Sequence, residues 1–200
     1  AARVRRRVRQ PAAHVEHARS LTAAAGLCAH LFDQSFEEFA ARTDLPPFSY
    51  IALHGIWSWV SADNRAQIAA FIRRHLAPGG VLYLSYNTAA GMAAAQPLQN
   101  LLSVHASRVQ AAAVPPPQRM KAALDFAASV FGVQPSVVAQ TPGLQKRLET
   151  MTGQDPVYLA HEYLNSSWQP CSFAEVAQAM EGAKLTYAGS AHALDHVSAL

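Results

Sequence analysis

Two short apolar runs flank an amphipathic segment within residues 48–88, and this order constrains the fold more than any other feature of the chain. The first run, 50–53, stops at a His-Gly pair, and the second, 81–85, follows a Pro-Gly-Gly turn. Apolar runs of this length between turn residues are typical of strands buried on both faces of a sheet. The pattern predicts two strands of an α/β sheet.

The segment between the runs, 63–76, is predicted to form a helix. Ile68, Phe71 and Ile72 recur at helical spacing, while arginine and glutamine occupy the other face. The Pro-Gly-Gly turn ends the helix, because proline cannot continue it and glycine accepts a left-handed cap. A helical crossover makes the two strands parallel, so their carboxyl ends open on one edge, where ligands bind in open α/β sheets.

Side chains suited to chemistry follow both predicted strands at this edge. They are His54, Gly55, Trp57, Trp59, Tyr86, Asn87 and Thr88. Indole faces attract ammonium and sulfonium groups, and we interpret Trp57 as part of a site and Trp59 as packing. Hydroxyl and amide groups of Tyr86 and Asn87 could orient an acceptor amine. The alternatives stay open: a turn histidine bonded to backbone, and an asparagine that only favours the turn.

The pattern YIALHGIWSW, followed by HLAPGGVLYLSYNT, resembles the second half of a class I S-adenosylmethionine-dependent methyltransferase. Residues 158–165, followed by Trp168, Pro170, Phe173 and the run AEVAQAMEGAKLTYAGSA, resemble the methyltransferase regulatory domain that accompanies one branch of these enzymes. That branch includes bacterial protein-lysine methyltransferases of the rickettsial type. The resemblance covers about residues 12–192.

The resemblance implies a fold, a cofactor and a reaction. The expected fold is a partial doubly wound, Rossmann-like α/β sheet with a mainly helical insert. The expected cofactor is S-adenosylmethionine, and the expected reaction moves its methyl group to a nucleophile. A protein lysine is one candidate acceptor, so the expected partner is a methyl acceptor that the resemblance does not name further.

The resemblance also implies site residues. The segment after a third strand would contact adenine: an acidic or polar side chain takes the exocyclic amine, and an apolar one covers the ring. The residues expected to bind cofactor are Asp33, Gln34, Ser35, Phe36, His54, Gly55 and Trp57. Whether Asp33 or Ser35 takes the amine is left open, and Phe36 as simple core is the alternative. Our candidates for catalysis are His54, Tyr86 and Asn87.

The beginning of the chain departs from the methyltransferase pattern. Residues 14–26 are predicted to form a helix and 27–32 the third strand, so the first two strands would precede residue 12. No G-x-G motif occurs in the sequence, and the acidic ribose contact expected near Arg9 is replaced by arginine and glutamine. We therefore expect an N-terminally truncated methyltransferase that, alone, binds S-adenosylmethionine poorly or not at all.

The charge and the cysteine content limit which partners and which cellular location we expect. Five of the sixteen basic residues are arginines within positions 1–9, and the remainder of the chain carries eleven basic against thirteen acidic residues. The net charge of +3 thus arises from the arginines in positions 1–9 and not from a basic binding face, and no nucleic-acid partner is expected. No apolar run approaches the roughly 20 residues of a membrane span. Only Cys28 and Cys171 occur, so we expect no disulfide framework, no cysteine metal cage and a cytoplasmic location.

After residue 88 the composition shifts to alanine, glutamine and proline, and helices are predicted near 97–112, 118–131 and 142–150. This part is expected to cover the open edge of the sheet, where lids and recognition elements belong. A return helix over 172–181, with a capping box, and a strand over 184–188 should follow.

The expected organisation has four parts. They are an arginine-rich N-terminus (1–11), the methyltransferase α/β core (12–96), a helical regulatory or lid domain (97–170) and the return helix and strand (171–200).

Other function classes find less support. A Ser-His-Asp hydrolase lacks its G-x-S-x-G elbow. His161-Glu162 begins a zinc-hydrolase motif that Asn165 interrupts, and His192 and His196 lack an evident carboxylate third ligand. No metal is therefore expected. The remaining rival is a non-catalytic regulatory or protein-binding module whose helical part is the working surface. The sequence leaves homo-oligomer formation open.

Overall fold

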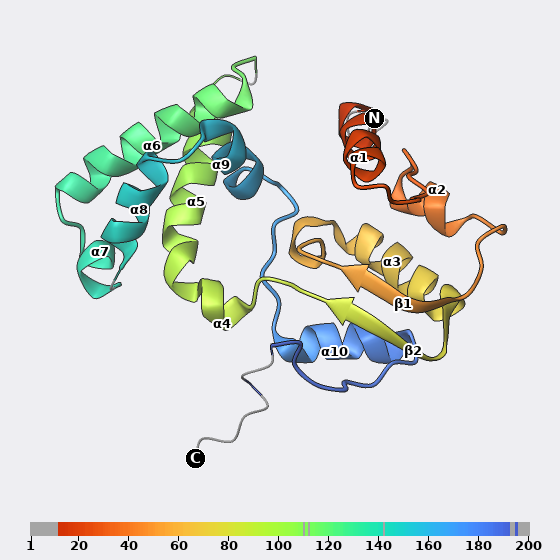
Figure 1. Ribbon diagram of the computed structural model, residues 1–200. Helices are drawn as coiled ribbons and strands as arrows, with labels where there is room; N and C mark the ends of the chain where they lie inside the picture. The colour runs from red at the N-terminus through yellow and green to blue at the C-terminus, as the bar shows by residue number, and fades with distance from the viewer. Residues whose placement is uncertain (1–11, 110, 112, 142, 193–194, 196–200) are drawn as a thin grey trace, which may run out of the picture.

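The computed structural model describes residues 12–109, 111, 113–141, 143–192 and 195. They form an α/β lobe, residues 12–92 and 165–192, and a helical lobe, residues 96–163, which lie side by side and are joined by two connections (Figure 1). The predicted arginine-rich N-terminus lies outside the described residues.

The α/β lobe contains a parallel two-stranded sheet with helices around it. Its elements are α1 (Ala12–Ala24), α2 (Phe36–Ala40), β1 (Phe48–Leu53), the 3₁₀ turn η1 (Trp57–Trp59), α3 (Ala62–His75), β2 (Leu76–Leu84), α4 (Ala89–Met92) and α10 (Phe173–Gly182). The predicted strand, helix, strand order and the parallel pairing are confirmed. Both strands point toward the helical lobe, so their carboxyl ends face it (Figure 1).

Only one face of the sheet is covered by the described residues. In the register that pairs Ile51 with Leu82, side chains of alternate residues pack with α3 and α10 in the core of the α/β lobe. On the other face Tyr50 and Val81 are 57% and 58% exposed. The predicted burial of the first strand on both faces is therefore wrong for the described chain, since no described helix covers this face. The α/β class itself is confirmed.

Two further predicted strands, 27–32 and 184–188, are absent. A strand needs a neighbour for its backbone groups, and the described residues pair with neither segment. The second segment begins instead with the turn that ends α10. Lys184 is left-handed there, with φ of 64°, and the Leu185 N–H donates to the Met180 carbonyl at 3.0 Å.

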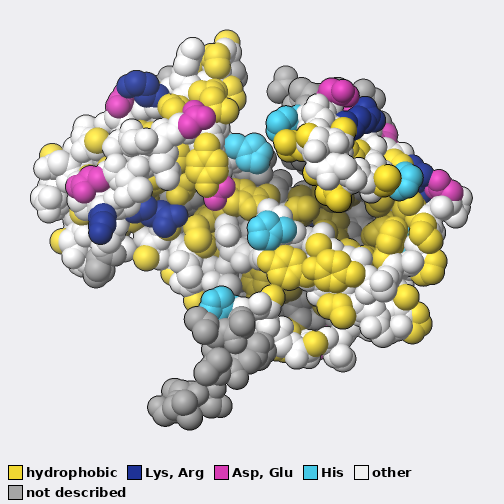
Figure 2. Space-filling view, in the orientation of Figure 1, with side chains coloured by type: hydrophobic (Ala, Val, Ile, Leu, Met, Phe, Trp, Pro, Cys, Tyr) yellow, Lys and Arg dark blue, Asp and Glu magenta, His cyan; other side chains and the backbone are white. Residues whose placement is uncertain are grey.

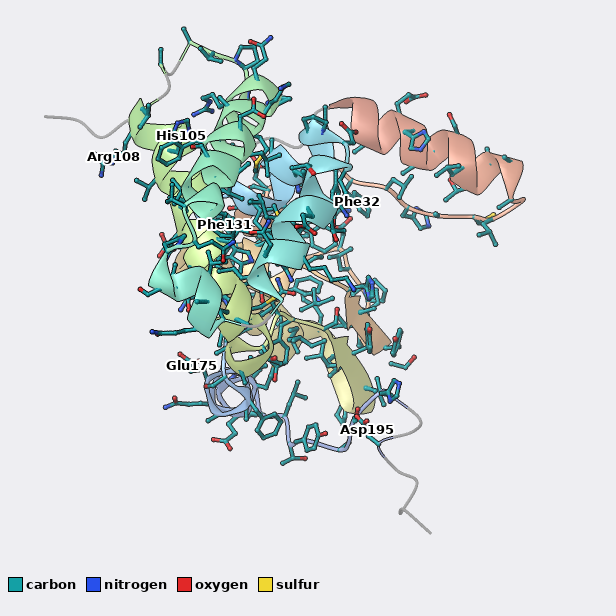
Figure 3. All side chains as sticks on the ribbon, turned by 90° about the vertical axis from the view of Figure 1, so that its left-hand side faces the viewer. Phe32, His105, Arg108, Phe131, Glu175 and Asp195 are labelled. Atoms are coloured by element: carbon teal, nitrogen blue, oxygen red, sulfur yellow. The ribbon has the colours of Figure 1, made fainter. Side chains whose placement is uncertain are left out.

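The helical lobe has a hydrophobic core of its own. Its elements are α5 (Gln96–Val104), a π-helical turn (His105–Val109), α6 (Pro116–Gly132), α7 (Ser136–Gln140), α8 (Leu144–Thr152) and α9 (Pro156–Tyr163), preceded by the 3₁₀ turn η2 (Ala93–Ala95). Leu98, Leu102 and Met120 are fully buried in this core, and Figure 3 labels Phe131 within the same lobe. The three predicted helices correspond to α5, α6 and α8.

Two short helices of this lobe are not predicted from the sequence. α7 is only five residues long, and α9 begins at an Asp-Pro pair. The Asp155 carboxylate accepts from the Val157 N–H at 2.9 Å and caps α9. The predicted capping box of α10 is confirmed, because Ser172 and Glu175 exchange backbone and side-chain hydrogen bonds. Among the described helices, none combines the length and apolarity that crossing a membrane would require.

Gly80 lies at an irregularity of the sheet. Pairing steps from 48 to 50 on β1 but from 76 to 81 on β2, so the chain around Gly79 and Gly80 bulges out of register. Gly79 has φ of 77°, the left-handed region that glycine tolerates. A Cβ on Gly80 would lie 2.9 Å from the Ala77 carbonyl oxygen and 3.1 Å from that of Ser49. Backbone atoms cannot rotate away as a side chain would.

We expect Gly80→Ala to lower the free energy of unfolding by about 1–3 kcal/mol, because the strand pair must separate to admit the methyl group. Denaturant titration followed by circular dichroism measures the change. Gly182→Ala at the end of α10 is the matched control, since nothing lies within 4 Å of its added Cβ. Equal losses for both variants would contradict the close approach.

Candidate functional site

The carboxyl ends of β1 and β2 bring an imidazole, a phenol and a hydroxyl together. His54 Nδ1 lies 3.2 Å from Tyr83 Oη and 3.5 Å from Ser85 Oγ. The His54 and Tyr83 rings stack with centroids 5.9 Å apart. The Gly55 N–H donates to Ser85 Oγ at 2.7 Å, which anchors the turn after β1 to β2. We call His54, Tyr83 and Ser85 the His54 cluster.

Tyr83 and Ser85 are not among the site residues predicted from the sequence. Both lie within the second predicted strand, and side chains of a buried strand are expected to pack rather than react. The available signal was the period-two alternation of β2, which places residues 83 and 85 on the face opposite Leu82 and Leu84. The small side chain of Ala52, the residue paired with Tyr83, also adds little cover there.

His54 is exposed, and Tyr83 and Ser85 are partly exposed, so the cluster can meet a substrate. Figure 2 shows the surface hollowed between the two lobes, with histidine side chains along the hollow. A neutral imidazole can accept a proton from an incoming nucleophile, and hydroxyl groups can orient it. The arrangement is therefore able to perform general base chemistry.

Ser58 joins the strand ends to the connection between the lobes. Its side chain is fully buried, and its Oγ accepts from the Asn87 N–H at 2.8 Å. The Ser58 carbonyl accepts from the Gln169 N–H at 2.9 Å, and the Cys171 N–H donates to the Asn87 carbonyl at 3.0 Å. Three segments that are far apart in the sequence thus meet around one buried residue, Ser58.

Trp57 is packed rather than open. Its side chain is 3% exposed and belongs to the core of the α/β lobe. The Arg65 guanidinium carbon lies 5.8 Å from the indole centroid, and Arg65 Nε donates to the Trp57 carbonyl at 2.8 Å. The ring centroids of Trp59 and Trp168 are 6.4 Å apart, and Trp168 belongs to the connection that follows the helical lobe. The role of Trp57 in cofactor binding stays a prediction.

The three proposed catalytic residues are not gathered in one cluster. His54 contacts Tyr83, whereas Tyr86 packs against the core of the α/β lobe. Burial, followed by the proximity of Cys171 and Tyr187, raises the pKa of Tyr86 above that of a free phenol. Asn87 bonds through its main chain to Ser58 and Cys171.

The predicted adenine contacts lie in the segment before α2. Ser35 caps this helix, with its Oγ accepting from the Glu38 N–H at 3.1 Å. Gln34 Oε1 accepts from Arg42 Nη1 at 3.4 Å, and Phe36 packs against the core of the α/β lobe. Asp33 is exposed. Between the described residues of this segment and the His54 cluster, no hydrogen bond forms, and the cofactor roles stay predictions.

Other charged groups give no sign of a metal site. Within the described chain, no set of three histidine, cysteine or carboxylate side chains gathers in a way that could hold a metal ion.

Burial raises the pKa of Glu162 on α9, while His161 and Arg147 oppose that rise. Cys28 and Cys171 are free, and burial raises the pKa of the Cys171 thiol. Figure 3 shows Glu175 on α10, below the helical lobe.

Comparison with known proteins gives a family match over the end of the chain and two relatives of similar sequence. Residues 155–200 match the model of a family described as "Predicted methyltransferase regulatory domain". The chain is 43% identical over 188 residues to the uncharacterized protein sll1526 of Synechocystis, which covers 94% of this chain and 36% of that relative. It is 33% identical over 58 residues to protein RP028 of Rickettsia prowazekii, or 29% of this chain and 23% of that protein.

Solved structures of PKMT2 from Rickettsia typhi share the fold. The match to one has a TM-score of 0.61 at 20% identity and covers 86% of this chain and 31% of that one. The match to PKMT2 in complex with AdoHcy has a TM-score of 0.64 at 22% identity and covers 88% and 33%. The resemblance to rickettsial-type methyltransferases and to their regulatory domain is thus confirmed, and the chain spans about a third of the Synechocystis and PKMT2 chains.

We expect Ser58→Ala to lower the free energy of unfolding by about 1–3 kcal/mol, because the Asn87 N–H would be buried without an acceptor. Chemical denaturation monitored by tryptophan fluorescence measures it. Ser129→Ala on α6 is the control, since that exposed hydroxyl bonds only within its own helix, to the Phe126 carbonyl. A loss no larger than the control would show that Ser58 does not hold the segments together.

Proposed function

We propose that this chain is part of an S-adenosylmethionine-dependent methyltransferase that transfers a methyl group to a protein lysine. Its sheet would form part of a doubly wound Rossmann-like sheet. The observation that carries the proposal is the parallel strand pair whose carboxyl ends face the helical lobe, in a fold shared with a protein solved in complex with AdoHcy. In α/β folds, ligands bind at that edge.

Methyl transfer is an in-line displacement. The lysine nitrogen attacks the sulfonium methyl carbon, a C–N bond forms, and the C–S bond breaks to leave AdoHcy as a neutral thioether. The nitrogen carries a lone pair only when the amine is neutral, so the lysine ammonium must lose one proton before the attack, and the product is a methylated ammonium. The protein's main contribution is to hold donor and acceptor in line.

We propose that His54 accepts this proton as the general base. Its Nδ1 is held by Tyr83 Oη at 3.2 Å, which leaves the other ring nitrogen to face the acceptor. The Asn87 side-chain amide and the hydroxyl of the partly buried Tyr86 would orient the amine. The cofactor would lie against Gly55 and Trp57, with its adenine toward Asp33, Gln34, Ser35 and Phe36.

A second candidate function is a non-catalytic regulatory or binding module. It is favoured by one observation, the separate hydrophobic core of the helical lobe, which does not depend on the sheet. A lobe that packs by itself can present a surface without a working site beside it. Under either function we propose a cytoplasmic location, which the two free thiols support.

Cofactor binding separates the two candidates. We expect AdoHcy titrated by calorimetry to bind the full-length Synechocystis relative and to bind this chain more weakly or not at all, because this sequence holds no Gly-rich cofactor turn. Tight binding by this chain would show that the Gly-rich turn is dispensable. Absence of binding to both proteins would overturn the methyltransferase proposal and favour the module.

We expect His54→Ala to lower methyl transfer about 10²- to 10⁴-fold when this chain replaces the matching part of the Synechocystis relative, because the general base is lost. Radiolabelled methyl groups incorporated into polylysine measure the rate. His17→Ala, an exposed histidine on α1, is the matched control. Unchanged transfer by the His54 variant in an active chimera would remove His54 from the mechanism.

A further inference from the structure

A pocket of about 340 Å³ lies between the two lobes, and amide side chains dominate its lining. The polar side chains that the argument uses are Gln96, Gln99, Asn100, Ser103, Asn165 and Gln169. The volume lies at the lower end of the range of about 300–1,000 Å³ typical of ligand pockets. No residue that lines it is charged.

One wall of the pocket is a face of α5. Gln96, Asn100 and Ser103 recur at the spacing that places side chains on one side of a helix. Among the described residues, these three side chains make no hydrogen bond with the protein. They leave both N–H donors and oxygen acceptors for a ligand.

The wall is fixed from behind by a buried amide. Gln99 is 6% exposed, and its Nε2 donates to the Tyr163 carbonyl at 3.3 Å. This bond ties α5 to the end of α9. It thereby helps to hold the helix face against the pocket.

The opposite wall is the connection that leads from the helical lobe back to α10. Asn165 Nδ2 donates to the Trp59 carbonyl at 3.1 Å, and its Oδ1 accepts from the Ser167 N–H at 2.8 Å. Gln169 Oε1 accepts from Arg65 Nη1 at 2.9 Å, so its Nε2 amide group is left to donate. Both amides are held by the α/β lobe or by their own turn.

The lining selects a neutral ligand that both donates and accepts hydrogen bonds. With no cation among the lining residues, phosphate and carboxylate groups find no counter-charge. Side-chain amides carry the same donor and acceptor groups as the peptide unit, so they match a polypeptide main chain. The indole of Trp168, also in the lining, offers an apolar surface to the side chains of such a segment.

The pocket is joined to the ends of the strands. The Gln169 N–H donates to the Ser58 carbonyl, and Ser58 Oγ accepts from the Asn87 N–H. Ala89, two residues after Asn87, lines the pocket. The pocket is therefore adjacent to the strand ends that carry the proposed site.

We propose that this pocket binds a short extended stretch of the acceptor polypeptide through its main-chain amides and thereby presents an adjacent lysine to the strand ends. The inference rests on the proposed function, because it assigns how that function's substrate is recognised. It makes recognition depend on an unstructured or extended substrate segment rather than on a charged sequence.

Nuclear magnetic resonance on the 200-residue chain tests the pocket without cofactor. The probe is acetyl-Ala-Ala-Lys-Ala-Ala-amide, compared with the same peptide carrying N-methylated backbone amides. We expect the side-chain amide signals of Gln96, Asn100 and Gln169 to shift with the first peptide and not with the second. Asn100→Leu should weaken the first peptide about 2- to 10-fold, the value of one hydrogen bond.

Gln178→Leu, which removes an exposed amide from α10, should leave the affinity unchanged. Equal binding of the two peptides, no shift up to the solubility of the probe, or equal loss in both variants would overturn the proposal. Stronger shifts with maltotriose than with the peptide would assign the pocket to neutral sugars instead. Calorimetry with AdoHcy tests the proposed function separately. If the relative binds AdoHcy but the peptide causes no shift in this chain, the peptide-binding role of the pocket is wrong while the proposed function stands.

Discussion

The architecture depends on the buried hydroxyl of Ser58 and the main-chain groups around it. Through this residue, the turn after β1 meets the end of β2 at Asn87 and the interlobe connection at Gln169. The bonds satisfy main-chain N–H groups of Asn87, Gln169 and Cys171, and a main-chain N–H that loses both its partner and water is costly. They fix the helical lobe beside the strand ends, so the His54 cluster and the amide-lined pocket keep their places relative to each other.

The sequence predicted those elements whose signals, such as apolar spacing or a capping box, lie within one short segment. The apolar spacing of α3 and the capping box at Ser172 each lie within one segment, and both were found. The strands predicted over 27–32 and 184–188 were wrong. A strand forms only beside a paired neighbour, and the sequence of one segment does not reveal whether such a neighbour is present. The full burial expected for β1 failed for the same reason, since covering a face requires distant residues.

For the site, the sequence indicated the edge of the sheet but not the face on which each side chain lies. Tyr83 and Tyr86 are three residues apart, yet one stacks on His54 and the other packs into the core. Period-two alternation separates them only once the register with β1 is known. The amide-lined pocket combines α5 with a segment more than sixty residues later, and no local pattern connects those two.

The sheet of the described chain has two strands and therefore two outer edges. Outward-facing backbone groups along those edges are templates for a further strand, and two-stranded sheets are marginal without support from packing. Together with the exposed Tyr50 and Val81, they make this lobe the part most prone to self-association at high concentration. Handling the protein in dilute solution, or with an added strand fused to an edge, is the practical consequence.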